Sequence, residues 1–187
     1  MTHIFEPPHS DEIADMQAWE RSFWLARAYM EASLCLCQSM LDGGFSSQYS
    51  SSRVVLHLAR HGVELFLKGA LGVFSKDGVP ATHDLSHLYS KYKTTYPDPI
   101  FDIDVPARFL LSANFDLFQD ELRAFHATLD QRHRYATDRQ GKTFATKEEF
   151  DPAEILNELQ SLDRQQKIIE WAYIRRISSG KPAHQLP

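Results

Sequence analysis

The sequence has few of the features that mark membrane-spanning or secreted proteins. No stretch approaches the ~18 uncharged apolar residues that a membrane span needs. Residues 1–16 do not combine a basic region with an apolar core, so they do not read as a secretory signal. We therefore expect a cytoplasmic protein with no membrane contact.

Cysteine is also scarce. The only two cysteines, Cys35 and Cys37, are two residues apart. On a helix such positions point in nearly opposite directions, so the pair can neither bind one metal ion together nor form an easy disulfide. We expect both to be small buried side chains, which argues against a thiol nucleophile.

Common catalytic motifs are missing as well. The chain contains no P-loop, no G-x-G-x-x-G pattern and no G-x-S-x-G pattern. Its formal net charge is −5, so the protein as a whole is no general polyanion binder, although a local basic face is compatible with that balance. These absences favour a binding role over catalysis and predict no cofactor.

What is present is typical of one globular domain. Hydrophobic residues make up 43% and charged residues 24% of 187 residues, enough for a core that folds unaided. We predict an N-terminal arm over 1–14, a single helical domain over 15–178 and a flexible tail over 179–187.

Helical periodicity dominates that domain. A first helix, which Ser10 could cap, carries one apolar face at alternating steps of three and four residues and ends at Asp42-Gly43-Gly44. A second helix starts between Tyr49 and Ser52 and runs to about Val73. Its two glycines, Gly62 and Gly69, share one side, where a neighbouring helix can approach closely.

Three further helices are predicted. A short one begins after Thr82 or Asp84, either of which can cap it, and ends before Pro97. Another covers 107–135, with a break near 112–114. The last starts at Asp151-Pro152-Ala153-Glu154, an acidic cap followed by proline at the first position, and ends near Ile177. The pattern predicts an all-α bundle of four to five mainly antiparallel helices.

The second helix has a polar face. Its members recur at steps of three or four residues and are Arg53, His57, His61, Glu64 and Lys68. One interpretation is a groove that binds a phosphate or a partner. The alternative is a solvated stripe in which Glu64 and Lys68 form an i,i+4 ion pair worth roughly 0.2–0.5 kcal/mol.

Two other groups of polar residues were considered as sites. His83 and His87 are one turn apart and could hold zinc, but no further ligand of suitable type accompanies them, so we predict no metal site. A later segment places Arg, His and Asp on one helical face. Its basic and imidazole groups would suit RNA binding and proton transfer, and the alternative is a helix C-terminus that favours cations. The candidate catalytic residues of that second site are Arg123, His126, His133 and Arg134.

Two short segments resemble the core of HEPN domains, named for nucleotide-binding in higher eukaryotes and prokaryotes. They are Leu58-Ala59-Arg60-His61-Gly62-Val63-Glu64-Leu65-Phe66-Leu67-Lys68-Gly69-Ala70-Leu71 and Thr82-His83-Asp84-Leu85-Ser86-His87-Leu88. The resemblance covers about residues 15–135. It implies a helical bundle, often a symmetric dimer, and an association with RNA processing, defence or toxin–antitoxin systems and nucleotidyltransferase-like partners.

The chain departs from the active RNases of that family. Those RNases carry an Arg followed after four to six residues by a His, a spacing that this sequence lacks: seven residues separate Arg53 from His61, and two separate Arg123 from His126. We therefore predict a non-catalytic, dimeric module that binds a nucleotide, RNA or protein partner through the second helix and His83. The alternatives are a metal-independent RNase acting through residues 123–134 and a structural subunit of a helical complex.

Overall fold

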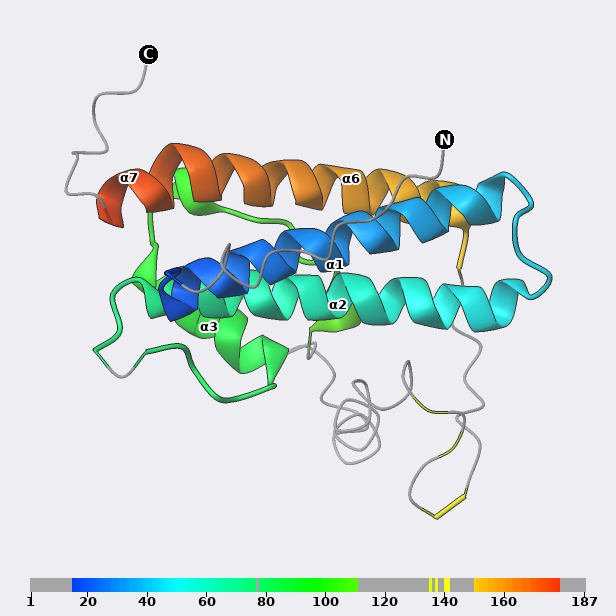
Figure 1. Ribbon diagram of the computed structural model, residues 1–187, viewed down its shortest axis with the longest axis horizontal. Helices are drawn as coiled ribbons and strands as arrows, with labels where there is room; N and C mark the ends of the chain where they lie inside the picture. Colours follow the sequence, from blue (N-terminus) through cyan, green and yellow to red (C-terminus); the bar gives the residue numbers. More distant parts are fainter. Residues whose placement is uncertain are drawn as a thin grey trace, which may run out of the picture.

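The structure of the chain is a computed structural model that describes residues 15–76, 78–110, 135, 137, 140–141 and 150–178. Within these residues the fold is all-α and contains no strand, which confirms the predicted fold class. Three long helices lie side by side, with α1 antiparallel to both of its neighbours (Figure 1). Their bounds are Ala18–Leu41 for α1, Gln48–Gly72 for α2 and Pro152–Ile168 for α6.

Shorter elements complete the described part. Helix α3 spans Leu85–Thr95 and packs on α2. Helix α6 continues through a π-helical turn, η4 (Ile169–Ile174), into α7 (Arg175–Ser178). Two 3₁₀ turns, η2 (Pro99–Phe101) and η3 (Ala107–Phe109), lie in the connection after α3.

Side-chain caps fix where several helices begin. Asp84 accepts a hydrogen bond from the backbone N–H of His87 at 3.0 Å, and Asp151 accepts one from Ala153 at 2.8 Å. Each cap satisfies a backbone donor that the first helical turn leaves without a partner. The Asp151 cap was predicted, Asp84 was one of the two caps predicted for α3, and both helices start directly after their caps.

The contact between α1 and α2 depends on small residues. A Cβ atom at Gly62 would lie 3.2 Å from the carbonyl oxygen of Ala26, and one at Gly69 would lie 3.1 Å from that of Trp19. Both distances are tighter than ordinary van der Waals contact, so the backbones approach because these positions have no side chain. The predicted close approach at the two glycines is confirmed.

The core lies between α1, α2, α3 and α6. Aromatic side chains run through it, with Phe66 of α2 5.4 Å from Phe23 and 6.2 Å from Tyr92 between ring centroids. The hydroxyl of Tyr92 donates to the carbonyl oxygen of Phe101 at 2.7 Å, so the buried polar atom has a partner. These contacts tie the connection after α3 to the bundle.

Three local predictions were wrong. Helix α1 begins at Ala18, not after Ser10, because the Glu20 carboxylate accepts the Gln17 N–H at 2.8 Å and closes the first turn there. The helix expected over 107–135 does not begin at Ala107, because the 3₁₀ turn Ala107–Phe109 is followed by Leu110 in an extended conformation; residues 111–134 lie outside the described residues. Cys37 is buried as expected, but Cys35 is exposed because the two cysteines face opposite sides of α1.

Candidate functional site

The candidate site is centred on the Glu64 carboxylate of α2. Its Oε1 accepts hydrogen bonds from Nζ of Lys68 at 2.8 Å and from Nδ1 of His83 at 2.9 Å. Nδ1 of His61 lies 3.8 Å from Oε2. One carboxylate therefore gathers three basic side chains from α2 and from the segment that precedes α3.

The segment between α2 and α3 makes this arrangement possible. It folds back along α2, so that His83 lies beside Glu64, two turns before the helix ends. Two hydrogen bonds hold this segment where it enters α3. Thr82 Oγ1 accepts the Asp84 N–H at 3.1 Å, and Asp84 caps α3. Residues 19 apart in sequence thus meet around one buried acid.

Burial and the neighbouring basic groups shift the pKa of the Glu64 carboxyl in opposite directions. The residue is 2% exposed. Burial by itself would raise the pKa of the carboxyl, because it penalises the charged form. The approach of His61 and Lys68, together with the hydrogen bond from His83, outweighs burial and lowers the pKa to about 2. The carboxylate is therefore ionised at neutral pH, and as an acceptor it requires the proton of His83 to sit on Nδ1.

The outer part of the site consists of imidazole rings. The rings of His57 and His61 stack with centroids 6.2 Å apart and an interplanar angle of 13°. Tyr29 of α1 meets His61 edge to face at 4.5 Å. The His61 side chain is 31% exposed and that of His83 is 73% exposed, so both combine an anchored ring with access to solvent.

The positions of these residues were predicted from the sequence only in part. The predicted face is named here the α2 polar face and comprises Arg53, His57, His61, Glu64, Lys68 and His83. His57 and His61 stack on each other, and His83 contacts Glu64 as expected. The solvated-stripe alternative is wrong for Glu64 and Lys68, because both side chains are buried. At the N-terminal end of the face, Arg53 donates to the carbonyl oxygen of Tyr135.

Arg60 supports the α2 polar face from outside it, and the sequence did not predict this role. It is buried and its guanidinium lies 3.5 Å from the carbonyl oxygen of His83, so it supports the backbone at the point where His83 contacts Glu64. Arg60 follows Ala59 and precedes His61 in the sequence, and its one available signal was this position within the run that resembles HEPN domains.

The two histidines considered for zinc do not converge. His83 is committed through Nδ1 to Glu64, and His87 is exposed on α3. Over the residues that the structure describes, no group of three or more His, Cys, Asp or Glu side chains comes together as a metal site would require. None of the described helices is both long and apolar enough to cross a membrane.

A separate open pocket of about 430 Å³ lies against α3. Its polar lining is largely satisfied within the protein: the Tyr89 hydroxyl donates to Ile103, the Thr94 hydroxyl donates to Ser90, and Lys93 pairs with Asp102. None of the predicted site residues lines it. The pocket therefore belongs to neither predicted site.

The second predicted site cannot be placed. Arg123, His126, His133 and Arg134 all lie outside the described residues. Comparisons of the chain with protein-family models, with curated proteins and with solved structures find no match in any of the three.

Proposed function

We propose that this chain is a non-catalytic, HEPN-like helical module that binds a phosphate-bearing ligand, a nucleotide or RNA, on the α2 polar face. One observation supports this most directly: the residues that carry the resemblance, Glu64, Lys68 and His83, form one hydrogen-bonded cluster around a buried carboxylate. A cluster of this kind fixes the positions of the basic side chains around it, and fixed donors bind an anion better than mobile ones.

The face divides into an inner and an outer part. Glu64 and Lys68 are buried and neutralise each other, so we assign them a structural role. His57, His61 and His83 reach solvent, Arg53 lies about one turn before His57 on α2, and none of these four groups is acidic. Guanidinium groups and imidazole rings that carry a proton on both nitrogens donate hydrogen bonds to phosphate oxygens, and Arg provides a charge that is independent of pH. The ring of Tyr29 at the edge of this outer part adds an aromatic surface.

A binding role is also more consistent with the geometry than catalysis. The ionised acid of the cluster, Glu64, is 2% exposed, and its Oε1 accepts hydrogen bonds from Lys68 and His83, so its carboxylate is not presented to a substrate in solvent. A general base needs to lie within hydrogen-bond reach of the proton that it removes. We therefore assign Glu64 to holding the face together.

Fluorescence anisotropy would test the proposal with two probes, a labelled ten-residue oligouridylate and a labelled ATP analogue. We expect the wild-type chain to bind at least one probe, and the double variant His57→Ala with His61→Ala to bind it at least tenfold more weakly. His87→Ala is the matched control, since it removes an exposed imidazole from α3 and should change the affinity by less than twofold. No binding by the wild type up to ~1 mM of either probe, or equal losses in the control, would refute the proposal.

Two related outcomes distinguish the alternatives. Cleavage of RNA by the wild type without metal, abolished by His126→Ala with His133→Ala, would favour the RNase. The dimer that the resemblance implies stays a prediction, and light scattering tests it: a mass near 21.5 kDa is that of one chain and would remove a site shared across two chains.

A further inference from the structure

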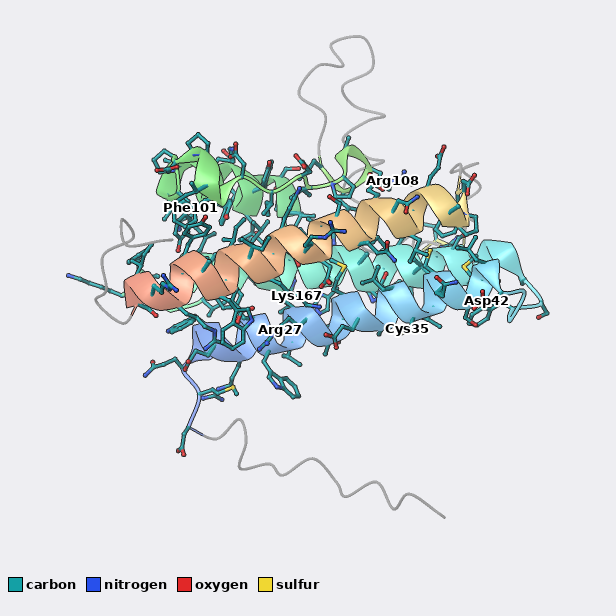
Figure 2. The ribbon with its side chains drawn as sticks, turned by 90° about the horizontal axis from the view of Figure 1, so that it is seen from above. Arg27, Cys35, Asp42, Phe101, Arg108 and Lys167 are labelled. Carbon is teal, nitrogen blue, oxygen red and sulfur yellow. The ribbon has the colours of Figure 1, made fainter. Side chains whose placement is uncertain are left out.

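Helix α1 turns an apolar face outward. The side chains at its outward positions are Leu25, Ala28, Ala32 and Cys35, and all four are exposed, Leu25 to 40%. Figure 2 shows α1, in blue, along one edge of the bundle, with α3, in green, on the other side. The outward positions of a surface helix are normally polar or charged, so this face has the composition of a contact surface.

The charged side chains of α1 lie toward α6 instead. Between residues 22 and 41 the only charged residues are Arg27 and Glu31. Arg27 pairs with Glu170 at 3.7 Å, and Glu31 pairs with Lys167 at 3.5 Å. Figure 2 labels Arg27 and Lys167 where the two helices face each other. The fold therefore uses the charges of α1 within the chain and leaves its apolar side chains to solvent.

The apolar surface continues onto α2. Val54 is 46% exposed, and Leu58 and Leu65 are half-buried. Their helical spacing puts these three between Gly62, which packs on α1, and the imidazole rings of the α2 polar face. The rings therefore border the apolar surface and do not interrupt it. We name the whole surface the α1 outward face; its members are Leu25, Ala28, Ala32, Cys35, Val54, Leu58 and Leu65.

The α1 outward face is large enough for a specific contact. A helix of 24 residues is about 36 Å long, and two such helices packed side by side present about 700 Å² on one side. Specific protein–protein interfaces bury about 800 Å² on each partner. One contact across this face would therefore reach the size of a standard interface.

We propose that the α1 outward face is an interface between two copies of this chain. Each chain has a formal net charge of −5, so two copies repel over most of their surfaces. The seven members of the α1 outward face carry no charge, so two copies can meet there without like charges opposing each other. This contact does not depend on a ligand on the α2 polar face.

The order of side chains along α1 also fits a two-fold axis. The large Leu25 lies at one end of the row, the small Cys35 at the other, and Ala28 and Ala32 lie between them. In an antiparallel pair with its axis at the level of residue 30, the alanines of the two copies face each other, and Leu25 of each copy lies opposite Cys35 of the other. Small side chains at the crossing let the two helix axes approach closely.

Other occupants fit less well. A helix that carries charges on its contact face would leave them without partners on the α1 outward face. A nucleic acid needs cations, which the members of this face do not provide. The face also contains no tryptophan or arginine, the residues that dominate binding hot spots, so we expect a reversible dimer with a Kd of about 10 μM.

Light scattering with the full chain tests the proposal. At ~200 μM, well above the expected Kd, the wild-type mass should approach twice 21.5 kDa, and that of Ala28→Arg should be near 21.5 kDa. Ala28 is exposed and arginine favours a helix, so this variant keeps the fold. Ala107→Arg is the matched control, because it makes the same change at an exposed alanine beside Arg108, on the opposite edge of the bundle (Figure 2), and should keep the wild-type mass.

The thiol of Cys35 reports whether the α1 outward face is the one that becomes covered. In the wild type, iodoacetamide should label Cys35 at least threefold more slowly at ~200 μM protein than at ~1 μM, where the chains are dissociated. In Ala28→Arg the two rates should be equal. The proposal is overturned if the wild type keeps the mass of one chain at ~200 μM, since something other than a second copy then covers the face. It is also overturned if Ala28→Arg still dimerises, if Ala107→Arg dissociates the dimer equally, or if the wild-type labelling rate does not change with concentration.

Discussion

The buried Glu64 carboxylate gives the sharpest quantitative prediction. Its pKa falls from 4.5 to about 2 on folding, because the basic groups around it outweigh the penalty of burial. A difference of that size corresponds to roughly 3 kcal/mol of stability at neutral pH. Removal of one partner from a buried ion pair costs about 3–5 kcal/mol in other proteins, which agrees.

The substitution Glu64→Gln keeps the shape of the side chain and removes its charge. We expect it to lower the free energy of unfolding by about 3 kcal/mol at pH 6. Because the pKa of Glu64 is lowered in the folded state, its contribution is complete above the ordinary value of 4.5 and disappears as the pH falls towards 2. The difference between wild type and variant should therefore shrink between pH 5 and pH 2.

Urea unfolding followed by circular dichroism at 222 nm would measure this difference at several pH values between 6 and 2.5. Glu158→Gln is the matched control, since that side chain is 37% exposed and lies 3.6 Å from Arg108, and an exposed pair contributes about 0–1 kcal/mol. A difference below ~1 kcal/mol at pH 6, or one that does not change with pH, would falsify the reasoning that Glu64 holds the cluster together by charge.

Three further predictions concern the frame around the site. Gly62→Ala and Gly69→Ala should each destabilise the protein by about 1–3 kcal/mol in thermal unfolding, although alanine favours a helix, because the added methyl meets the α1 backbone; a stabilised variant would contradict the close approach. Asp151→Ala should cost about 1 kcal/mol through loss of the α6 cap, and unchanged urea unfolding would show that the cap is dispensable. Iodoacetamide should label exposed Cys35 in the native protein and Cys37 only after unfolding, since burial raises the pKa of the Cys37 thiol to about 11; fast native labelling at both positions would contradict this.

Helix starts were predictable where one local signal determined them. Asp84 and Asp151 cap their helices through contacts two or three residues away, so the sequence contains the whole interaction. The start of α1 was misplaced because Gln17 with Glu20 closes the first turn, and a glutamine cap is a weaker signal than the serine at position 10. The start of a helix depends on residues that are close in sequence, so it is predicted correctly where the capping side chain is a strong cap and misplaced where the cap is weak.

Burial of charge was not predictable from helical spacing. A helical-wheel projection of α2 places Glu64 and Lys68 on its polar face, which predicts that both are exposed to solvent. It contains no information about the segment that covers them. That segment returns to α2 through a turn with Gly78 at a φ of +80°, a conformation that glycine adopts without strain. Arg60 was missed for the same reason, since its partner is a backbone carbonyl 23 residues away.

The inner and outer parts of the α2 polar face have different roles. The inner residues that carry the resemblance to HEPN domains can be kept for stability even where ligand binding by the outer residues is lost. Glu64 and Lys68 are buried, so loss of either one alone leaves an unpaired charge in the interior, whether or not the chain binds a ligand. His57 and His61 reach solvent and can change at little cost to folding. Variants of the inner pair should therefore lower stability and binding together, whereas variants of the outer rings should lower binding alone. If His57→Ala with His61→Ala reduced thermal stability as much as Glu64→Gln, the outer rings would be part of the frame, and the ligand would have to bind elsewhere.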